Sequence, residues 1–251
     1  MPGRPDRHLL AGDLHWWMNR RSLLAGAAAA GTVGLAGCLG GLLSTTSRES
    51  TPAGVGESVL AATDYELVGI ERRTTEETVA FAGQSETVTV TSYLTTYERR
   101  VGIEGVAETA TATFAVFSTP TLAVFGRALN PVGEQSTRDL VGLLEAEDDS
   151  IDDLDQDTDG TVTVLDQQTT KSRFAATTDV GGFPIDLDVH VTEAVERGDD
   201  FVVTFAAYPR SFRDIEADNV TALAESVSAE PPTTNESITG DPPANESPTD
   251  Q

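Results

Sequence analysis

Apolar and polar residues alternate without interruption over residues 185–191, and this alternation sets the class of fold. Its apolar members are Ile185, Leu187, Val189 and Val191, and its polar members are Asp186, Asp188 and His190. A period of two is typical of a β-strand with one face toward the core. The turn-forming residues 196–200 follow, and then a second apolar stretch at residues 201–208. The two segments therefore predict an antiparallel hairpin.

The same signals predict three further hairpins. Their paired segments are 78–81 with 87–97 around a turn at 82–85, 161–165 with 171–177 around a turn at 166–168, and 114–117 with 122–125 around a turn at Ser118, Thr119 and Pro120. Strands joined by short turns pair in the antiparallel direction. We therefore expect an antiparallel sheet of about eight strands.

Two or three short helices are expected beside this sheet. One covers residues 55–62, and a second begins at Ser136, which has Asp139 three residues later in the spacing of a capping box. The third follows Asp218 or Asn219 as N-cap and has apolar residues at helical spacing, namely Val220, Leu223, Ala224 and Val227. The predicted class is therefore α+β, with the helices on one face of the sheet and two related halves at 57–147 and 160–228.

Acidic residues outnumber basic ones by 41 to 16, the formal net charge is −25, and Lys171 is the only lysine. Repulsion among so many carboxylates destabilises a compact chain, but at molar salt the Debye length falls to about 3 Å. The composition therefore indicates a protein adapted to high salt, with an acidic face for a cationic partner as the alternative. Nucleic acid is excluded as a partner, because its binding depends on Lys and Arg that neutralise phosphates.

The N-terminal segment has the parts of an export signal. Arg20 and Arg21 resemble the twin-arginine pair that an export receptor reads, and residues 23–36 carry no charge. This run is shorter than the roughly 20 apolar residues of a membrane-spanning helix, as expected of a cleaved signal. Cys38, the only cysteine, closes a Leu-Ala-Gly-Cys sequence that resembles a lipoprotein processing site. The predicted partners are the export machinery and, through a lipid on Cys38, the membrane.

These features divide the chain into five parts. We expect residues 1–17 to be an extension upstream of the true start at Met18, or alternatively a long natural leader. Residues 18–37 are predicted to be the signal peptide and residues 38–54 a flexible tether. Residues 55–228 are predicted to form a single extracytoplasmic α+β domain, and residues 229–251 a disordered acidic tail rich in Pro, Thr and Asn. Asn235 and Asn245 in the tail begin N-glycosylation patterns. A third pattern begins at Asn219, in the predicted last helix, where it is less accessible.

Three segments resemble sequences of a known protein family. They are the signal itself, the stretch from Phe117-Ser118-Thr119-Pro120 to Asn130-Pro131-Val132-Gly133, and residues 190–203, His-Val-Thr-Glu-Ala-Val-Glu-Arg-Gly-Asp-Asp-Phe-Val-Val. Together they resemble a family of haloarchaeal, twin-arginine-exported lipoproteins of unknown function, over about residues 18–215. The resemblance implies a halophilic archaeon and attachment to the outer face of the cell membrane. It implies no activity.

One acidic segment has the spacing of a metal-binding loop. Its carboxylates, at positions 1, 3, 5 and 12 of a twelve-residue window, are Asp155, Asp157, Asp159 and Asp166. Gly160 stands at position 6, as in an EF-hand calcium loop. However, the closing residue is Asp instead of Glu, and residues 161–164 have a strand pattern where an EF-hand has a helix. The segment is a weak calcium candidate, and the favoured alternative is a solvated acidic connector without metal.

His190 is the only histidine after the predicted cleavage site, so a Ser-His-Asp arrangement would depend on it. The sequence has no Gly-x-Ser-x-Gly elbow, and its His and Cys residues are too few for a zinc site. We therefore favour a surface or half-buried structural role for His190, and we predict no cofactor. The predicted function is a non-catalytic, membrane-anchored envelope lipoprotein with an unknown ligand, partner protein or structural role. The alternatives are a surface hydrolase and a calcium-binding envelope protein.

Overall fold

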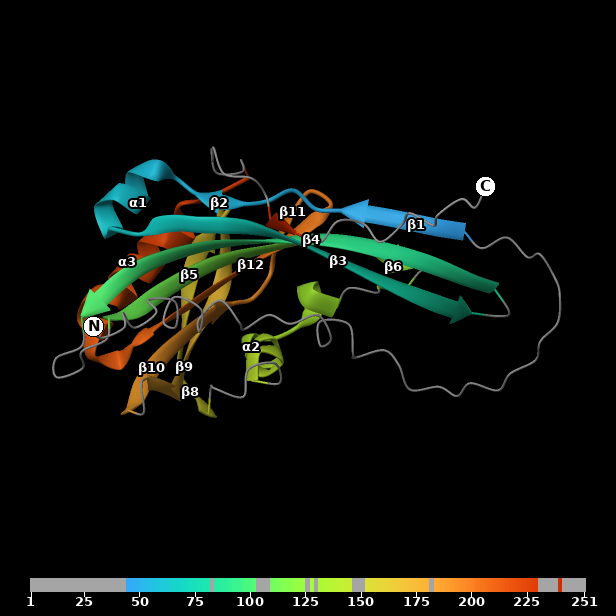
Figure 1. Ribbon diagram of the computed structural model, residues 1–251. Coiled ribbons are helices and arrows are strands. Elements are labelled where there is room, and N and C mark those ends of the chain that lie inside the picture. The colour runs from blue at the N-terminus through green and yellow to red at the C-terminus, as the bar shows by residue number, and fades with distance from the viewer. Residues whose placement is uncertain are drawn as a thin grey trace, which may run out of the picture.

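A ten-stranded, mostly antiparallel sheet is the frame of the computed structural model, which describes residues 44–81, 84–102, 109–124, 127–128, 131–145, 152–180, 183–229 and 239–240 (Figure 1). Its strands are β1 (Ser44–Glu49), β3 (Glu66–Phe81), β4 (Gln84–Gly102), β5 (Thr109–Pro120), β8 (Asp152–Val164), β9 (Gln167–Val180), β10 (Phe183–Thr192), β11 (Val195–Arg197), β12 (Asp200–Pro209) and β14 (Thr239–Gly240). The order across the sheet is β14-β3-β4-β5-β12-β10-β9-β8, with β1 beside β4 and β11 beside β12. The parallel pairs among these strands are β1 with β4 and β14 with β3.

Smaller elements complete the fold. Two short ladders join β2 (Gly54–Val55) to β13 (Val227–Ser228) and β6 (Ala123–Val124) to β7 (Arg127–Ala128). The helices are α1 (Glu57–Thr63), α2 (Thr137–Glu145) and α3 (Arg213–Glu225), with 3-10 turns η2 (Pro131–Glu134) and η3 (Arg210–Phe212). The predicted α+β class with an antiparallel sheet and short helices is confirmed. None of the helices in the described ranges is long and apolar enough to cross a membrane.

Three of the four predicted hairpins are confirmed. Strand β3 turns into β4, β8 turns into β9, and β10 pairs with β12, with the short strand β11 between them in the chain. The turn predicted at residues 196–200 joins β11 to β12, and Gly198 there has a φ of 61°, which glycine adopts without strain. The first predicted half supplies β3 to β5 and the second supplies β8 to β12, and the two sets meet where β5 pairs with β12.

The fourth hairpin prediction is wrong, because β5 continues through the predicted turn. Ser118 lies between Tyr93 of β4 and Val202 of β12. Thr119 is buried as well, and it receives a hydrogen bond from the Ser92 hydroxyl (2.9 Å). Ser and Thr favour turns when only their own neighbours supply hydrogen bonds. Here strands β4 and β12 pair with the backbone of the segment, and Ser92 of β4 supplies a partner for the Thr119 hydroxyl, so the segment stays extended.

Helix α2 begins with the predicted capping box. The backbone N–H of Ser136 donates to Oδ2 of Asp139 (3.1 Å), and the backbone N–H of Asp139 donates to Oγ of Ser136 (3.3 Å). Helix α3, in contrast, begins at Arg213 and not after Asp218 or Asn219. The additional turn forms because Arg213 and other polar residues in it bond to the sheet, which the local sequence does not reveal.

The helices cover both faces of the sheet, which corrects the prediction that they lie on one face. Leu187 of β10 belongs to the same apolar cluster as Leu140 of α2. Its neighbour Asp188 bonds to Arg213 of α3. Successive residues of a strand point to opposite faces, so α2 and α3 lie on opposite sides of β10. Helix α1 contacts α3, and Figure 1 shows these two helices at the same end of the molecule.

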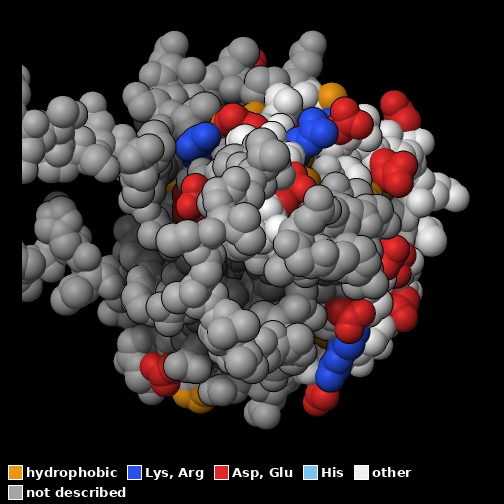
Figure 2. Space-filling view, turned by 90° about the vertical axis from the view of Figure 1, so that its right-hand side faces the viewer, with side chains coloured by type: hydrophobic (Ala, Val, Ile, Leu, Met, Phe, Trp, Pro, Cys, Tyr) orange, Lys and Arg blue, Asp and Glu red, His pale blue; other side chains and the backbone are white. Residues whose placement is uncertain are grey.

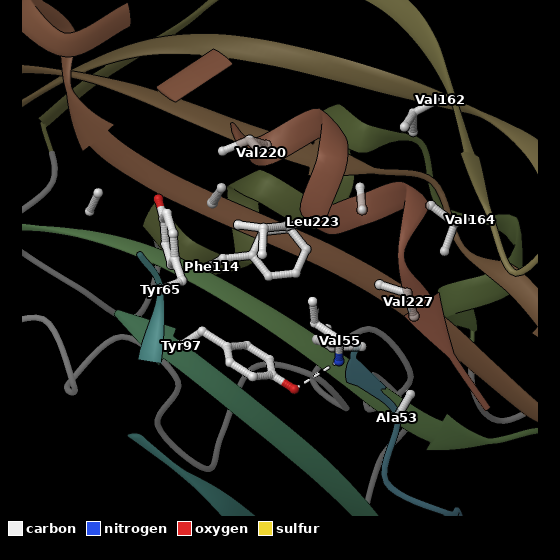
Figure 3. Close-up of a cluster of buried hydrophobic side chains, with 14 of the residues drawn as sticks. Ala53, Val55, Tyr65, Tyr97, Phe114, Val162, Val164, Val220, Leu223 and Val227 are labelled. Carbon is white, nitrogen blue, oxygen red and sulfur yellow. Dashed lines mark hydrogen bonds between the residues drawn. The ribbon is translucent and has the colours of Figure 1, made fainter. Parts of the chain in front are cut away.

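Apolar side chains fill the space between the sheet and helix α3 (Figure 3). Val59 and Leu60 of α1 pack against this cluster. Tyr97 of β4 and Phe114 of β5 are fully buried there, in one cluster with Val220 and Leu223 of α3. The phenol oxygen of Tyr97 accepts a hydrogen bond from the backbone N–H of Val55 (2.8 Å). This bond ties β2 and the beginning of α1 to the middle of the sheet.

Residues 44–49 of the segment predicted as a flexible tether form strand β1 of the sheet, and Gly54 at its end belongs to β2. Strand β1 pairs with residues 86–91 of β4, and the hydroxyl of the buried Ser50 donates to the carbonyl of Ser118 (3.0 Å). The Ser- and Thr-rich composition suggested a linker, but these residues also fit a strand when a neighbouring strand pairs with them. Of the predicted tail, residue 229 and residues 239–240 are described, and the latter pair with β3.

Candidate functional site

Polar and charged side chains from both the sheet and helix α3 meet in one part of the interface between them. They come from six elements and include Asp157 on β8, Lys171 and Arg173 on β9, Asp188 and His190 on β10, Tyr208 on β12, Arg210 on η3, and Arg213 and Glu216 on α3. The alternation over residues 185–191 predicted a polar side of β10, with Asp186, Asp188 and His190, opposite the face toward the core. In the structure α3 and η3 cover that side, so both faces of the strand are buried from Leu187 onward.

Asp188 is the carboxylate that fixes the beginning of α3. Its side chain is fully buried, and it accepts hydrogen bonds from Nε (2.5 Å) and Nη2 (2.7 Å) of Arg213 and from Nε of Arg210 (3.2 Å). Burial by itself raises the pKa of Asp188, but the hydrogen bonds and charge of Arg213, with the hydrogen bond of Arg210, outweigh it and lower the pKa. Asp188 therefore stays ionised and holds η3 and α3 against β10.

His190 is buried, so the predicted surface or half-buried position is wrong. Its Nε2 lies 2.7 Å from the hydroxyl of Tyr208, and the two rings stack with centroids 5.4 Å apart. Burial, followed by the positive charge of Lys171, lowers the pKa of His190 to about 3. Nδ1 is buried and has no hydrogen-bond partner among the described residues. Neither nitrogen has a serine hydroxyl within hydrogen-bond distance in the described part of the chain, so no serine of that part forms a Ser-His pair with His190.

Glu216 connects α3 to the opposite end of the sheet. Its side chain is fully buried; Oε2 accepts a hydrogen bond from the Tyr65 hydroxyl (2.8 Å), and Oε1 lies 3.2 Å from Nη2 of Arg99. Burial and then the charge of Glu216 raise the pKa of Tyr65, so this phenol remains a donor. Asn219, which begins the third glycosylation pattern, donates to Glu216 (3.4 Å) from within the helix.

Lys171, the only lysine of the chain, also lies beneath α3. Its ammonium donates to the hydroxyl of Thr221 (2.6 Å). Burial lowers the pKa of Lys171. The long side chain thus supports the middle of α3, whereas the arginines bind its beginning.

The four aspartates of the calcium candidate are not brought together. Asp155, Asp157 and Asp159 lie along the extended strand β8, and Asp166 has a φ of 61° in the β8–β9 turn. No three acidic, His or Cys side chains of the described residues form a group that would hold a metal ion. The favoured alternative, a solvated acidic connector, is corrected in part: residues 155–160 are exposed, but the segment is strand β8, which pairs with β9 over most of its length.

Two of these aspartates have protein partners instead of a shared ligand. Asp157 binds Nε (3.0 Å) and Nη2 (2.8 Å) of Arg173. Asp159 accepts a hydrogen bond from Ser172 (2.6 Å). Arg173 and Ser172 are neighbours on β9 and point to opposite faces. Asp157 and Asp159 reach these different sides, although they are two residues apart, because the register of β8 shifts between Gln156 and Thr158.

An open cavity of about 650 Å³ lies where α1, β3 and β4 meet. Its charged lining consists of Asp64, Glu66, Glu98, Arg99 and Arg100. Arg99 joins this cavity to the interface beneath α3, because its guanidinium also pairs with Glu216. The lining contains both acidic residues and arginines, so the cavity suits a small polar ligand that carries charges of both signs.

A second set of contacts, around the β11–β12 turn, was missed by the sequence analysis. Asp200 accepts hydrogen bonds from Arg197 (2.9 Å) and from the backbone N–H of Thr51 (3.0 Å), and Arg197 also donates to the carbonyl of Thr51. A Cβ at Gly133 would lie 2.3 Å from the ring of Phe201, so any larger residue there would have to displace this ring. The turn signal at residues 196–200 was visible, but nothing near it indicated a partner about 150 residues away.

The remaining predicted sites are outside the described residues. These are Arg20 and Arg21 of the export signal, the lipidation site Cys38, and the glycosylation candidates Asn235 and Asn245. Their interpretation continues to depend on the sequence.

Comparisons with known proteins give a family and one distant structural likeness. The model of a family described as a domain of unknown function, DUF6517, matches residues 52–228. None of the curated proteins matches this chain. Among solved structures, it is similar to PA94, a protein of unknown function from Pseudomonas aeruginosa, with 10% identity and a TM-score of 0.32, over 62% of this chain and 99% of that chain. So low a TM-score supports no conclusion about fold or function.

Proposed function

We propose that this chain, which belongs to the DUF6517 family, is a lipid-anchored, non-catalytic protein on the outer face of the cell membrane of a halophilic archaeon. Arg20 and Arg21 support export by the twin-arginine route, and the sequence that ends in Cys38 supports lipidation. The net charge of −25 and the single lysine support adaptation to high salt. Glycosylation at Asn235 and Asn245 is part of the same proposal.

One observation carries the non-catalytic part of the proposal. The buried ionisable groups beneath α3 are engaged with one another: Asp188 with Arg210 and Arg213, Glu216 with Arg99 and Tyr65, and His190 with Tyr208. A catalytic acid or base needs access to a substrate and a pKa near the working pH. The pKa of His190 is about 3, and its ring is buried. These groups hold α3 on the sheet, and the cavity beside Arg99 and Arg100 offers the ligand site.

Replacement of both Arg20 and Arg21 by Lys tests the export route. The receptor reads the arginine pair and not its charge alone, so the variant precursor is expected to accumulate in the cytoplasm. Fractionation followed by immunoblotting measures this, and an Arg48→Lys variant, at an exposed arginine after the predicted cleavage site, serves as the control. Export of the double variant at the normal level would refute the route.

The Cys38→Ser variant tests the anchor. Serine cannot form the thioether to lipid, so we expect the protein in the medium or as unprocessed precursor. The measurement is the mass of the N-terminal peptide together with the amount of protein in the membrane fraction. A single lipid chain binds a membrane only marginally, so firm attachment of the wild type predicts more than one chain. A Cys38→Ser protein that is processed normally and remains on the membrane would contradict lipidation.

A further inference from the structure

The long hairpin of β3 and β4 forms, together with β1, an arm that extends away from the helices (Figure 1). We use "arm" for residues 71–81 of β3, residues 84–91 of β4, and β1. Strand β1 is parallel to β4, and its first residue, Ser44, lies opposite Glu86, close to the turn of the hairpin. The chain therefore enters the described fold at the tip of the arm and runs from there toward the body.

Several contacts fix β1 in this direction. Glu49, at its end, accepts a hydrogen bond from the Tyr93 hydroxyl (2.5 Å). The backbone N–H of Ser50 donates to the carbonyl of Thr91 (3.0 Å), and Thr51 is bound by Asp200 of β12. The chain from Ser44 to Thr51 is therefore held along its length by strand pairing and by these bonds. These contacts place Ser44 at the tip of the arm.

The length of chain between Cys38 and Ser44 limits how far the tip can be from the lipid. Six residue steps separate the two positions, and a fully extended chain covers at most about 3.5 Å per residue, or about 21 Å in total. Strand β3 has 16 residues, which at 3.3 Å per residue correspond to about 50 Å. The length of β3, from the tip of the arm to the opposite end of the sheet, is therefore more than twice the greatest length of the link between Cys38 and Ser44.

We infer that the tip of the arm faces the membrane, and that the opposite end of the sheet, with α1, α3 and the cavity at Arg99 and Arg100, is held away from it. This inference rests on the lipid anchor at Cys38 proposed above. The cavity is lined by the first residues of β3 and the last residues of β4, which are the ends farthest along the strands from the tip. A ligand or partner of that cavity then comes from the cell exterior and not from the lipid.

Charge does not supply this orientation. Figure 2 views the molecule from the side to which the arm extends in Figure 1, and acidic side chains are scattered over its described surface with few Lys or Arg. Glu76 on the arm is exposed as well. Such a surface does not attract anionic lipid headgroups, and molar salt screens the repulsion within about 3 Å. The short link to the lipid is therefore the element that brings the tip to the membrane.

Two cysteine variants on the same strand test the orientation. Thr78 near the tip and Glu66 at the beginning of β3 are both exposed, and their 12 residue steps along β3 correspond to about 40 Å. Each variant, Thr78→Cys or Glu66→Cys, is labelled with a maleimide donor dye in native membranes that contain an acceptor dye on lipid headgroups, at the native salt concentration. Lipidated Cys38 does not react with maleimide. We expect strong donor quenching at position 78 and near-background quenching at position 66.

The outcomes separate the orientation from the anchor. Equal quenching at both positions, or stronger quenching at position 66, in protein that remains on the membrane would overturn the orientation and leave the anchor intact. Protein absent from the membrane, with Cys38 labelled by maleimide, would overturn the anchor and the orientation with it.

A flexible Gly-Ser insert of about 20 residues after Gly41, which adds roughly 25 Å of average reach, should reduce quenching at position 78 while the protein stays anchored. Unchanged quenching with this insert would refute the role of the short link.

Discussion

The Arg99→Gln variant is expected to lower the free energy of unfolding by about 3 kcal/mol, because it leaves the buried carboxylate of Glu216 without its ion-pair partner. Glu216 is fully buried, whereas the Arg99 side chain is 18% exposed. Glutamine keeps most of the length of the side chain and loses the charge. Tyr65 and Asn219 still bond to Glu216, but neither carries a positive charge. Denaturant unfolding at constant high salt measures the difference.

A neighbouring arginine offers a matched control. Arg100 lines the same cavity but is exposed, so Arg100→Gln should change stability by less than about 0.5 kcal/mol. The double variant Arg99→Gln with Glu216→Gln should recover much of the loss, because the buried charge is then gone while Tyr65 retains an acceptor. Equal stability of wild type and Arg99→Gln would show that the pair contributes nothing to the attachment of α3.

The second large effect concerns the response of His190 to acid. Its folded-state pKa is about 3, lowered from 6.5 by burial and then by the charge of Lys171. Below pH 6.5 the unfolded chain binds a proton at this site and the folded chain does not, so acid favours unfolding until the pH reaches about 3. The slope is about 1.4 kcal/mol per pH unit. Between pH 7 and pH 5 the wild type should lose about 2 kcal/mol from this residue alone.

The His190→Gln variant isolates this contribution, because glutamine does not titrate and can still bond to Tyr208. Both proteins contain the same carboxylates, so acid titration of Asp and Glu cancels in the comparison. We expect the variant to be less stable than the wild type at pH 7 and to lose less stability on acidification to pH 5, measured by denaturant unfolding at each pH. Parallel pH curves for the two proteins would contradict a buried, neutral His190.

Elements that depend on neighbours in the chain were predictable from the sequence. The Ser136–Asp139 capping box is formed within one helical turn, and its spacing in the sequence is sufficient to recognise it. The hairpins at 82–85 and 166–168 join strands that are adjacent in the chain, so their alternation and turn residues predicted the pairing. The α+β class followed from these local signals alone.

Features that depend on distant segments were decided by the tertiary structure. The local sequence of Ser118 and Thr119 predicts a turn, but pairing with β4 and β12 keeps these residues in a strand. The composition of residues 44–49 predicts a linker, but pairing with β4 makes this segment a strand. The alternation in β10 did not reveal what covers its polar side, because Arg213, which covers Asp188, lies 25 residues later in the chain. The Tyr65–Glu216 bond joins residues 151 apart. Periodicity states which residues of a strand share a face, but only the packing of other elements decides whether that face meets water or a partner.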